Sequence, residues 1–406
     1  MGESRREGVR LVHVTTVAAT LGLFRGQVGF MRERGFTLHF VSSPGEELQQ
    51  FGRAEEVPVY GVEMSRRMTP FADLAGVVRL WRRLRQIDPV VVHAHTPKAA
   101  LLGMLSSWLA RVPVRVYHLR GLPLVTAGGW QRWLLSRTER ISCALAHQVL
   151  CVSNSLRQIA LDEGLCPPAK IKVLAHGSSN GVDSERRFDP SRFGPEFRST
   201  QRRELGIPSE GLVIGFVGRL VRDKGVVELC EAWQVLRTEF PELHLLVIGP
   251  VEERDPVPQW VLGAFRSDPK VHMIAWADEV ARLYSVMDVV ALPTYREGFP
   301  NVPLEAAAMC LPVVVSAVTG CLDAVVDGVT GTMVPVRDGA ALTAALRSYL
   351  TDPALRSGHG SAGRERVLRL FRQEILWGAL HTEYLRLLSE RDLPEPGSDR
   401  APVSGD

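Results

Sequence analysis

Two glutamates eight residues apart stand in the stretch Tyr295–Met309, YREGFPNVPLEAAAM, and carry the clearest chemical signal in the sequence. Glu297 lies on a Gly/Pro-bearing loop after the apolar stretch Val289–Pro293, and Glu305 lies inside a helix rich in Leu, Glu and Ala. Ligands of α/β sheets bind where the carboxyl end of a strand feeds a helix. Two carboxylates at that place suit a hydroxyl-rich ligand, such as a sugar and a ribose.

The start of the same helix adds backbone donors. We expect the free N–H groups of Gly298, Phe299 and Asn301 to face an oxygen-rich ligand. Glu297 could instead be an ordinary loop carboxylate, and Glu305 a helix-face carboxylate paired with an arginine. Two glutamates at this spacing are common by chance, so the prediction rests on the whole string.

A second cluster, GRL followed by KG, comes directly after the apolar stretch Leu212–Val217. Gly218 allows a ligand to approach the backbone closely, and Arg219 and Lys224 carry charges that suit a diphosphate. A βα loop with ordinary surface charges is the alternative. Together the two clusters predict a site for a diphosphate, a sugar and a ribose in the second half.

In the first half, Thr16 and then Gly22 follow the first expected strand. Gly22 and Gly26 are too sparse for the phosphate-binding pattern GxGxxG, so a plain turn remains open. The segment HAHTPK ends a later strand, and its two histidines point to one face of that strand.

Those two histidines, His93 and His95, make a metal site conceivable. The sequence offers no third ligand at a sensible spacing and no Asp-x-Asp pair, so we predict no metal ion. We expect His95 and Lys98 to line a ligand cleft instead.

The next strand ends in YHLRG, which places His118 and Arg120 on one face. We assign Arg120 to phosphate or acceptor binding, with His118 as its partner, while a buried structural role for His118 is equally open. A Gly/Ser/Asn loop is expected to close this half over Ile171–Asp183, and its end, Asn180–Asp183 (NGVD), could be a plain turn.

Alternating strands and helices must position these residues, and this βαβ rhythm argues for a doubly wound parallel sheet in each half. Strands are expected at Val9–Thr16, Phe36–Ser43, Val57–Met64, Val90–His95, Val114–Arg120, Gln148–Ser153, Leu212–Val217, Leu243–Gly249, Val271–Ala275, Val289–Pro293, Val313–Ser316 and Thr332–Val336. Helices are expected at Phe71–Ile87, Lys98–Ala110, Val226–Phe240, Glu279–Met287 and Gly339–Leu350. The segment Phe188–Pro208 is expected to be an irregular linker, and Val367–Ser389 one long amphipathic helix.

Composition is that of a globular protein too long for one core: 406 residues, 45% hydrophobic and 23% charged. No apolar run approaches the roughly 18 residues that span a bilayer. The start, MGESRREGVR, lacks the apolar segment of a signal peptide. Six cysteines without CxxC spacing are typical of reduced core residues, so we expect a cytoplasmic protein.

Charge is divided unevenly along the chain. Residues 1–180 carry 23 Lys/Arg and 13 Asp/Glu, a net charge of +10, and the remainder carries −7. Two helical stretches of the basic half, Arg79–Arg85 and Trp130–Arg140, combine arginine with tryptophan. We predict docking on an anionic membrane surface. Solvated helix backs with one core tryptophan each are the alternative.

The two clusters of the second half resemble the motifs of retaining glycosyltransferases of family 4. Their Glu-x7-Glu motif and their GRL…KG segment match YREGFPNVPLEA and GRL…KG here. The similarity covers about Val9 to Leu387 and is greatest to capsular, exopolysaccharide and lipid-linked glycan transferases. It is carried by LFRGQ, VSSPGEEL, MSRRMTP, HAHTPKAALLG and GSSNGVD.

The resemblance implies the GT-B fold, with two Rossmann-like domains facing a cleft and a final helix that crosses back onto the first domain. The implied divisions are an acceptor-binding domain at 1–183, a sugar-nucleotide-binding domain at 184–372, the crossing helix at 373–390 and a disordered tail at 391–406.

Site roles also follow from the resemblance. Glu297 would contact the donor sugar, Glu305 the ribose, and Arg219 and Lys224 the diphosphate, while Gly22 would sit in a loop facing the donor. Thr16, His95 and Arg120 would face the acceptor. Relatives often have His where Arg120 stands, which leaves open whether His118 or Arg120 takes that role.

The expected activity is therefore retaining transfer of a sugar from a UDP-sugar, of the N-acetylhexosamine or hexuronic acid type, to a lipid-phosphate-linked acceptor. The enzyme would need no metal or other cofactor and would act peripherally at the inner face of the plasma membrane. A UDP-sugar epimerase of the same fold and glycosylation of a soluble natural product are the alternatives. A nucleic-acid-binding role for the basic half lacks any recognisable reading motif, so we expect no nucleic-acid partner.

Overall fold

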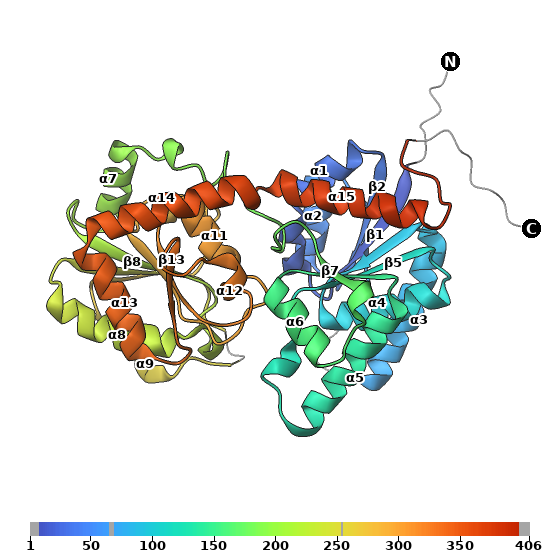
Figure 1. The fold of residues 1–406 in the computed structure, drawn as a ribbon, viewed down its shortest axis with the longest axis horizontal. Helices are drawn as coiled ribbons and strands as arrows, with labels where there is room; N and C mark the ends of the chain where they lie inside the picture. Colours follow the sequence, from blue (N-terminus) through green and yellow to red (C-terminus); the bar gives the residue numbers. More distant parts are fainter. Residues whose placement is uncertain (1–7, 65–68, 253–254, 398–406) are drawn as a thin grey trace, which may run out of the picture. The chain divides into compact units, whose positions relative to one another are not determined.

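Two parallel β-sheets organise the chain in the computed structural model, which describes residues 8–64, 69–252 and 255–397 (Figure 1). The chain divides into unit 1, Met1–Asn180 with Glu374–Asp406, and unit 2, Gly181–Gln373. Each unit holds one sheet and its covering helices. The α/β fold of two doubly wound sheets that the sequence predicts is confirmed.

The sheet of unit 1 has seven parallel strands in the order β3-β2-β1-β4-β5-β6-β7. Its strands are β1 (Val9–Val14), β2 (Phe36–Ser42), β3 (Val59–Gly61), β4 (Val91–Ala94), β5 (Val114–Leu119), β6 (Gln148–Cys151) and β7 (Ile171–Val173). The strand order reverses between β1 and β4, so their carboxyl ends flank the point where such sheets bind ligands.

Two helical layers cover the sheet of unit 1. One face packs on η1 (Ala18–Phe24), α1 (Gln27–Arg32), α2 (Glu46–Glu55) and α15 (Gln373–Ser389). The other face carries α4 (Pro97–Leu109), which packs between α3 (Pro70–Ile87) and α5 (Gly129–Leu145). Shorter elements complete the unit: η2 (Pro123–Val125), α6 (Asn154–Asp162) and η3 (Pro168–Lys170).

The C-terminal helix α15 is part of the core of unit 1 although it comes last in the chain (Figure 1). Its apolar side chains join those of β1, β2, β4 and β5 in one buried cluster, which includes Leu380, Tyr384, Leu387 and Leu388. The predicted return of the final helix to the first domain is confirmed.

The sheet of unit 2 has six parallel strands in the order β10-β9-β8-β11-β12-β13. Its strands are β8 (Leu212–Val217), β9 (Leu243–Ile248), β10 (Val271–Ile274), β11 (Val289–Leu292), β12 (Val313–Ser316) and β13 (Gly331–Val334). Its helices are η4 (Pro190–Arg192), α7 (Pro195–Glu204), η5 (Arg222–Lys224), α8 (Val226–Glu239), α9 (Gln259–Ser267), α10 (Val280–Tyr284), α11 (Asn301–Ala308), α12 (Cys321–Ala324), α13 (Gly339–Thr351) and α14 (Pro353–Leu370). The strand order reverses between β8 and β11.

Three sequence-based expectations about elements were wrong. The single helix expected over Val367–Ser389 is two helices, because α14 ends at Leu370 and the Phe371 carbonyl accepts a hydrogen bond from the Val182 amide at 2.8 Å. The expected linker contains η4 and α7, and the loop expected to close the first half begins with β7. In each case contacts with a distant segment of the chain determine the element more than the local sequence pattern does.

In the part of the chain that the structure describes, no helix is both long enough and apolar enough to cross a bilayer. All six cysteines are free thiols, five of them buried and Cys310 exposed. Pro396, near the end of the described chain, lies against Gly35. Residues 398–406 of the expected tail and Ser65–Met68 of MSRRMTP lie outside the described residues.

Candidate functional site

The loops after β8 and β11 of unit 2 are fastened to each other at the carboxyl edge of the sheet. The Asp223 carbonyl accepts hydrogen bonds from the Tyr295 amide at 2.8 Å and the Thr294 hydroxyl at 3.1 Å. The Arg296 guanidinium pairs with the Asp223 carboxylate at 2.9 Å. These contacts bring the two sequence clusters, GRL…KG and YREGFPNVPLEA, to one place.

Two glycines allow close approaches of the backbone at this edge of the sheet. A Cβ on Gly225 would lie 1.9 Å from the Pro293 carbonyl oxygen, and Gly225 has φ +71°. A Cβ on Gly320, which has φ +78°, would lie 2.5 Å from the Gly298 carbonyl oxygen. Both positions combine a left-handed backbone with a contact that leaves no room for a side chain.

Lys224 and Glu297 form an ion pair at the centre of this edge. Both side chains are largely buried, with 16% and 17% of their surface exposed. The thiol of Cys321 lies in the same environment, and burial, reinforced by the Glu297 charge, raises its pKa well above its usual value. The structure therefore joins one residue of each predicted cluster in a single charged site.

Gly218 and Arg219 come directly after β8, in the same loop as Lys224. The Arg219 guanidinium contacts the Glu252 carboxylate at 2.8 Å, and half of the Arg219 side chain is exposed. The Gly218 amide donates to the Ile248 carbonyl, and its own carbonyl lies under Gly249, where a Cβ would be only 1.9 Å away. Arg219 can therefore turn toward a ligand, because its present partner lies near the surface.

Glu305 stands on α11 and accepts a hydrogen bond from the buried Tyr284 hydroxyl at 3.0 Å. Burial raises the pKa of Glu305, while the hydrogen bond from Tyr284 opposes the shift. At the start of the same helix, the side-chain oxygen of Asn301 is buried without a hydrogen-bond partner. The Phe299 ring packs against Phe371, so only the backbone of Phe299 can meet a ligand.

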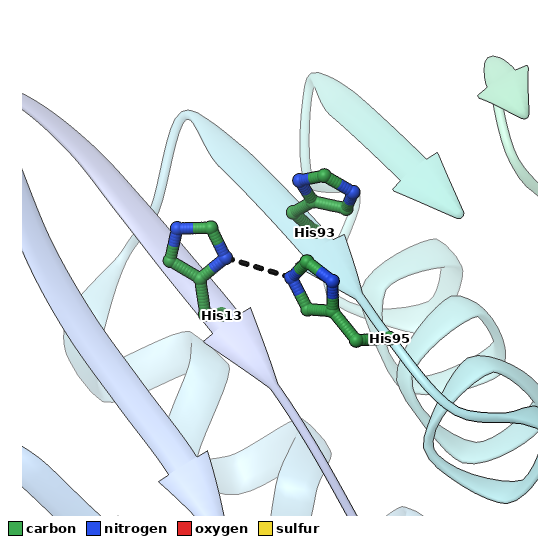
Figure 2. Close-up of side chains that lie close together, drawn as sticks. All are labelled: His13, His93 and His95. Carbon is green, nitrogen blue, oxygen red and sulfur yellow. Dashed lines mark hydrogen bonds between the residues drawn. The ribbon is translucent and has the colours of Figure 1, made fainter. Parts of the chain in front are cut away.

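Unit 1 holds a different cluster, four buried histidines at the carboxyl edge of its sheet. His13 on β1 and His93 on β4 are register neighbours, and His95 follows β4 (Figure 2). His118 lies on β5. The His93 and His118 rings stack with centroids 5.2 Å apart, and His93 Nδ1 lies 2.6 Å from the Tyr384 hydroxyl of α15.

All four imidazoles are neutral in this environment. Burial, together with nearby positive charge, lowers the pKa of His13 to about 3 and holds the pKa values of His93, His95 and His118 well below the usual range. The cluster therefore offers hydrogen-bond donors and acceptors but no charge at neutral pH.

Arg120 supplies the charge beside these histidines. Its Nε and one terminal nitrogen lie 3.3 Å and 3.2 Å from His95 Nδ1, and its other terminal nitrogen donates to the Ser179 carbonyl at 2.9 Å. Burial lowers the pKa of Arg120 to about 10, so the guanidinium stays charged at neutral pH.

A small cavity of about 20 Å³ opens beside Arg120, with room for about one water molecule. His95, His118 and Arg120 line it together. Further polar lining comes from Gln27, Ser178, Ser179 and Asn180, and the Trp377 indole, which donates to Asn180 at 2.8 Å, closes it on the side of α15.

A third histidine near His93 and His95, which the sequence did not reveal, makes the metal question concrete. The ligating nitrogens of His13, His93 and His95 lie within 4.8 Å of one another. However, Arg120 can only donate, so His95 Nδ1 must accept, and the proton of neutral His95 sits on Nε2. That Nε2 already faces His13 Nδ1 at 2.8 Å, and a dication would also lie beside a guanidinium. The donor set fits a hydrogen-bonded chain better than a metal ion.

The other predicted residues of unit 1 lie apart from this cavity. The Thr16 hydroxyl meets the Thr96 hydroxyl at 2.6 Å and accepts from the Ala99 amide, which ties β1 to the start of α4. Lys98 forms an ion pair with Asp73 of α3 at 2.6 Å. Gly22 is exposed within η1, in a 3-10 helix rather than the glycine-bearing loop expected there.

The two halves of the chain match two glycosyltransferase family models. Residues 197–366 match the family model Glycosyl transferases group 1, and residues 5–177 match the Glycosyl transferase 4-like domain. The capsular polysaccharide biosynthesis glycosyltransferase CapM of Staphylococcus aureus is 32% identical over 384 residues, which cover 94% of this chain and 98% of CapM. The N,N'-diacetylbacillosaminyl-diphospho-undecaprenol alpha-1,3-N-acetylgalactosaminyltransferase of Campylobacter jejuni is 26% identical over 287 residues, 69% of this chain and 73% of that protein.

Solved structures agree in fold. The crystal structure of Anabaena HepE in complex with UDP and glucose matches with a TM-score of 0.76 at 19% identity, covering 93% of this chain and 99% of HepE. WaaG, a glycosyltransferase involved in lipopolysaccharide biosynthesis, matches with a TM-score of 0.68 at 17% identity, covering 92% and 99%. With both family models matched in sequence order and a relative 32% identical over nearly its full length, the chain belongs to the group 1 glycosyltransferases, a family of retaining hexosyltransferases with the GT-B fold.

Proposed function

We propose that this glycosyltransferase moves a sugar, of the N-acetylhexosamine or hexuronic acid type, from a UDP-sugar to a lipid-phosphate-linked acceptor, with retention of anomeric configuration. The observation that carries the donor side is the Lys224–Glu297 ion pair at the carboxyl edge of unit 2, with Glu305 on the adjoining helix. The UDP bound to HepE and the capsular and diphospho-undecaprenol names of the relatives support the choice of substrates.

In this proposal the ion pair keeps the donor site organised before the donor arrives. Lys224 and Arg219 bind the diphosphate and stabilise the charge that develops on it as the glycosidic bond breaks. Glu297, released from part of its contact with Lys224, accepts hydrogen bonds from the sugar hydroxyls. Glu305, held by Tyr284, accepts from the ribose hydroxyls. The amides of Gly298, Phe299 and Asn301 add donors along the start of α11.

Retention follows from attack on the face that the diphosphate leaves. The acceptor hydroxyl oxygen bonds to the anomeric carbon, the bond from that carbon to the phosphate oxygen breaks, and the departing phosphate takes the hydroxyl proton. This step needs no protein nucleophile and no protein general base. Positioning of the two substrates is then the main contribution of the protein.

The layer of α3, α4 and α5 supports contact with an anionic membrane surface. Phe71 on α3 and Trp130 and Trp133 on α5 expose 92%, 76% and 59% of their surface. The alternative of one core tryptophan in each helix does not fit, since Trp81 of α3 is only half-buried and both tryptophans of α5 are exposed. Neighbouring arginines such as Arg82 and Arg85 are exposed as well. Aromatic side chains beside arginines suit a surface of anionic lipid headgroups.

The direct test of the donor site is thermal stabilisation of the full chain by a panel of nucleotides and UDP-sugars, since a ligand of the folded state raises the melting temperature. We expect a shift with UDP and a larger one with a single UDP-sugar. Both shifts should disappear in Lys224→Ala and Glu305→Ala. No shift with any nucleotide would overturn the proposed function, and release of an epimerised sugar nucleotide without acceptor would replace it with the epimerase alternative.

A further inference from the structure

Arg120 is a half-buried cation that has no acidic partner among the described residues. Its contacts are the neutral ring of His95 and the carbonyl of Ser179, and among the described residues no carboxylate lies within ion-pair distance. The buried arginine of unit 2, Arg202, shows the ordinary arrangement, because it pairs with Asp288 at 2.9 Å. A buried charge that lacks its counter-ion is costly to the fold, so an anionic ligand would relieve that cost.

The geometry of the contacts shows which edge of Arg120 is available. A guanidinium carries five N–H groups, and the side formed by Nε and one terminal nitrogen is directed at His95 Nδ1. One more N–H donates to Ser179. Two N–H groups on the terminal nitrogens therefore remain, and Arg120 is only half-buried, so they can meet a ligand. Paired N–H groups of this kind match the oxygens of a phosphate.

The histidines fix the direction of the hydrogen bonds behind Arg120. His95 accepts from Arg120 at Nδ1 and, being neutral, donates from Nε2 to His13 Nδ1 at 2.8 Å. His13 then carries its proton on Nε2, which is buried and has no partner. The reverse direction would place an N–H of His95 against the guanidinium. The chain from His13 through His95 to Arg120 therefore has only one arrangement of protons that suits a charged Arg120.

We propose that Arg120 binds the phosphate of the acceptor, and that His95 and His13 are positioning residues that hold its guanidinium in place. The identity of the acceptor in this inference rests on the proposed function. The evidence for an anion site comes from residues of unit 1 alone. The cavity of about 20 Å³ is too small for a phosphate group, so the anion lies at its mouth, against the free edge of Arg120. The polar residues Ser178 and Ser179 border the same cavity.

The test is calorimetric titration of the full chain with geranyl diphosphate, a water-soluble lipid diphosphate, in the presence of saturating UDP. UDP fills the donor site, so the remaining binding reports a second anion site. Geraniol, which lacks the diphosphate, is the control ligand. A separate UDP titration of each variant reports the donor site and the folding of the protein.

His95 offers a matched pair of substitutions. His95→Asn keeps an acceptor oxygen near the position of Nδ1, which faces Arg120, whereas His95→Gln places its amide near the position of Nε2, which faces His13. We expect Arg120→Gln and His95→Gln to weaken geranyl diphosphate binding by roughly tenfold or more, the usual effect of losing a charge-assisted hydrogen bond. His95→Asn and His13→Asn should stay within about twofold of the wild type. UDP affinity should be unchanged in all four variants.

Four results would overturn the proposal. Wild-type protein that binds geranyl diphosphate no better than geraniol has no phosphate site, and an Arg120→Gln variant that binds as the wild type does removes Arg120 from it. Equal affinities in His95→Asn and His95→Gln would remove the positioning role. A loss of UDP affinity in Arg120→Gln would assign Arg120 to the donor diphosphate instead. Failure of wild-type protein to bind UDP would count against the proposed function alone.

Discussion

At the scale of single residues, the two sites use charge in opposite ways. In unit 2 each charged residue among those predicted to bind the ligand has a partner of its own: Lys224 has Glu297, Arg219 has Glu252, and Glu305 has Tyr284. In unit 1 a guanidinium stands against neutral rings. The charges of the proposed donor site are therefore balanced before a ligand binds, whereas the proposed site at Arg120 remains cationic.

The ribose contact gives the first prediction. If Glu305 accepts from the ribose hydroxyls, wild-type protein should bind UDP more tightly than 2′-deoxy-UDP, by roughly three- to tenfold for one hydrogen bond. Glu305→Gln should lose most of this difference. Competition for the UDP-induced thermal shift measures both ligands. A preference that persists unchanged in Glu305→Gln would separate Glu305 from the ribose.

Buried neutral histidines also predict a response to acid. The pKa of His13 falls from 6.5 to about 3 on folding, so below pH 6.5 the unfolded chain takes up a proton that the folded chain refuses. The contribution of His13 to the free energy of unfolding is therefore fully present above pH 6.5. It decreases as the pH falls, by up to about 1.4 kcal/mol per pH unit. Thermal unfolding between pH 5 and 7.5 should show a shallower acid loss in His13→Asn. An identical slope would mean that His13 is charged in the fold.

The meeting of the two clusters of unit 2 could be predicted because each cluster is one short continuous string at the carboxyl end of a strand. His13 could not be recognised in the same way, because its neighbours His93 and His95 stand about 80 positions away in the sequence. The signal that could have found it is the register of β1 on β4, which sets His13 beside His93 once those strands are known to be adjacent. Strand adjacency is a property of the sheet and not of either segment.

At the scale of elements, the fastening of the β8 and β11 loops depends on Gly225. Gly225→Ala would place a Cβ 1.9 Å from the Pro293 carbonyl oxygen at a φ of +71°. We expect it to destabilise unit 2 by at least about 2 kcal/mol and to weaken UDP binding, because both strain and overlap are introduced.

Gly263→Ala on α9 is the matched control for this substitution. Its Cβ would meet nothing within 4 Å, so it should leave UDP binding intact and stabilise the helix by about 0.5–1 kcal/mol. Calorimetric unfolding and UDP titration measure both variants. Equal behaviour of the two would show that the loops need no close contact.

The place of α15 in the core of unit 1 gives the next prediction. Ending the chain at Arg372 removes Leu380, Tyr384, Leu387 and Leu388 from that core. At about 1.5–3 kcal/mol for each buried side chain, the loss equals much of the stability of a typical domain. In this variant, limited proteolysis should cleave the chain within strands β1–β7. A chain ending at Gly397 keeps these contacts and should resist digestion as the full protein does.

The break between α14 and α15 shows where sequence periodicity fails. Apolar spacing continues through Phe371, and it predicts one helix. The helix ends because the Phe371 backbone pairs with Val182, a contact between segments almost 190 residues apart. The fold class and most strands can be predicted from the local sequence pattern. This interruption cannot, because it depends on Val182, which lies far from Phe371 in the sequence.

At the scale of the whole molecule, the exposed aromatic residues of unit 1 predict membrane association. Trp133→Ser should weaken binding to vesicles that contain anionic phospholipid, and the double variant with Trp130→Ser should lose at least about tenfold, because interfacial burial of each ring is lost. Trp260 of unit 2, half of whose surface is exposed, is the matched control, and Trp260→Ser should bind as the wild type does. Co-sedimentation with vesicles measures all three. Equal losses at Trp133 and Trp260 would point to general hydrophobicity and not to this surface.

The order of the chain has a consequence for its synthesis. Unit 1 is interrupted by the 193 residues of unit 2, and the helix that completes its core is made last. The ribosome adds about 5–20 residues per second, so roughly 10–40 s pass between the synthesis of the seven strands of unit 1 and the synthesis of that helix. During this interval unit 2 can fold, while unit 1 keeps an apolar face uncovered. The nascent chain should therefore depend on chaperones for its first half more than for its second, and a message truncated near its end should leave a folded unit 2 attached to an unfinished unit 1.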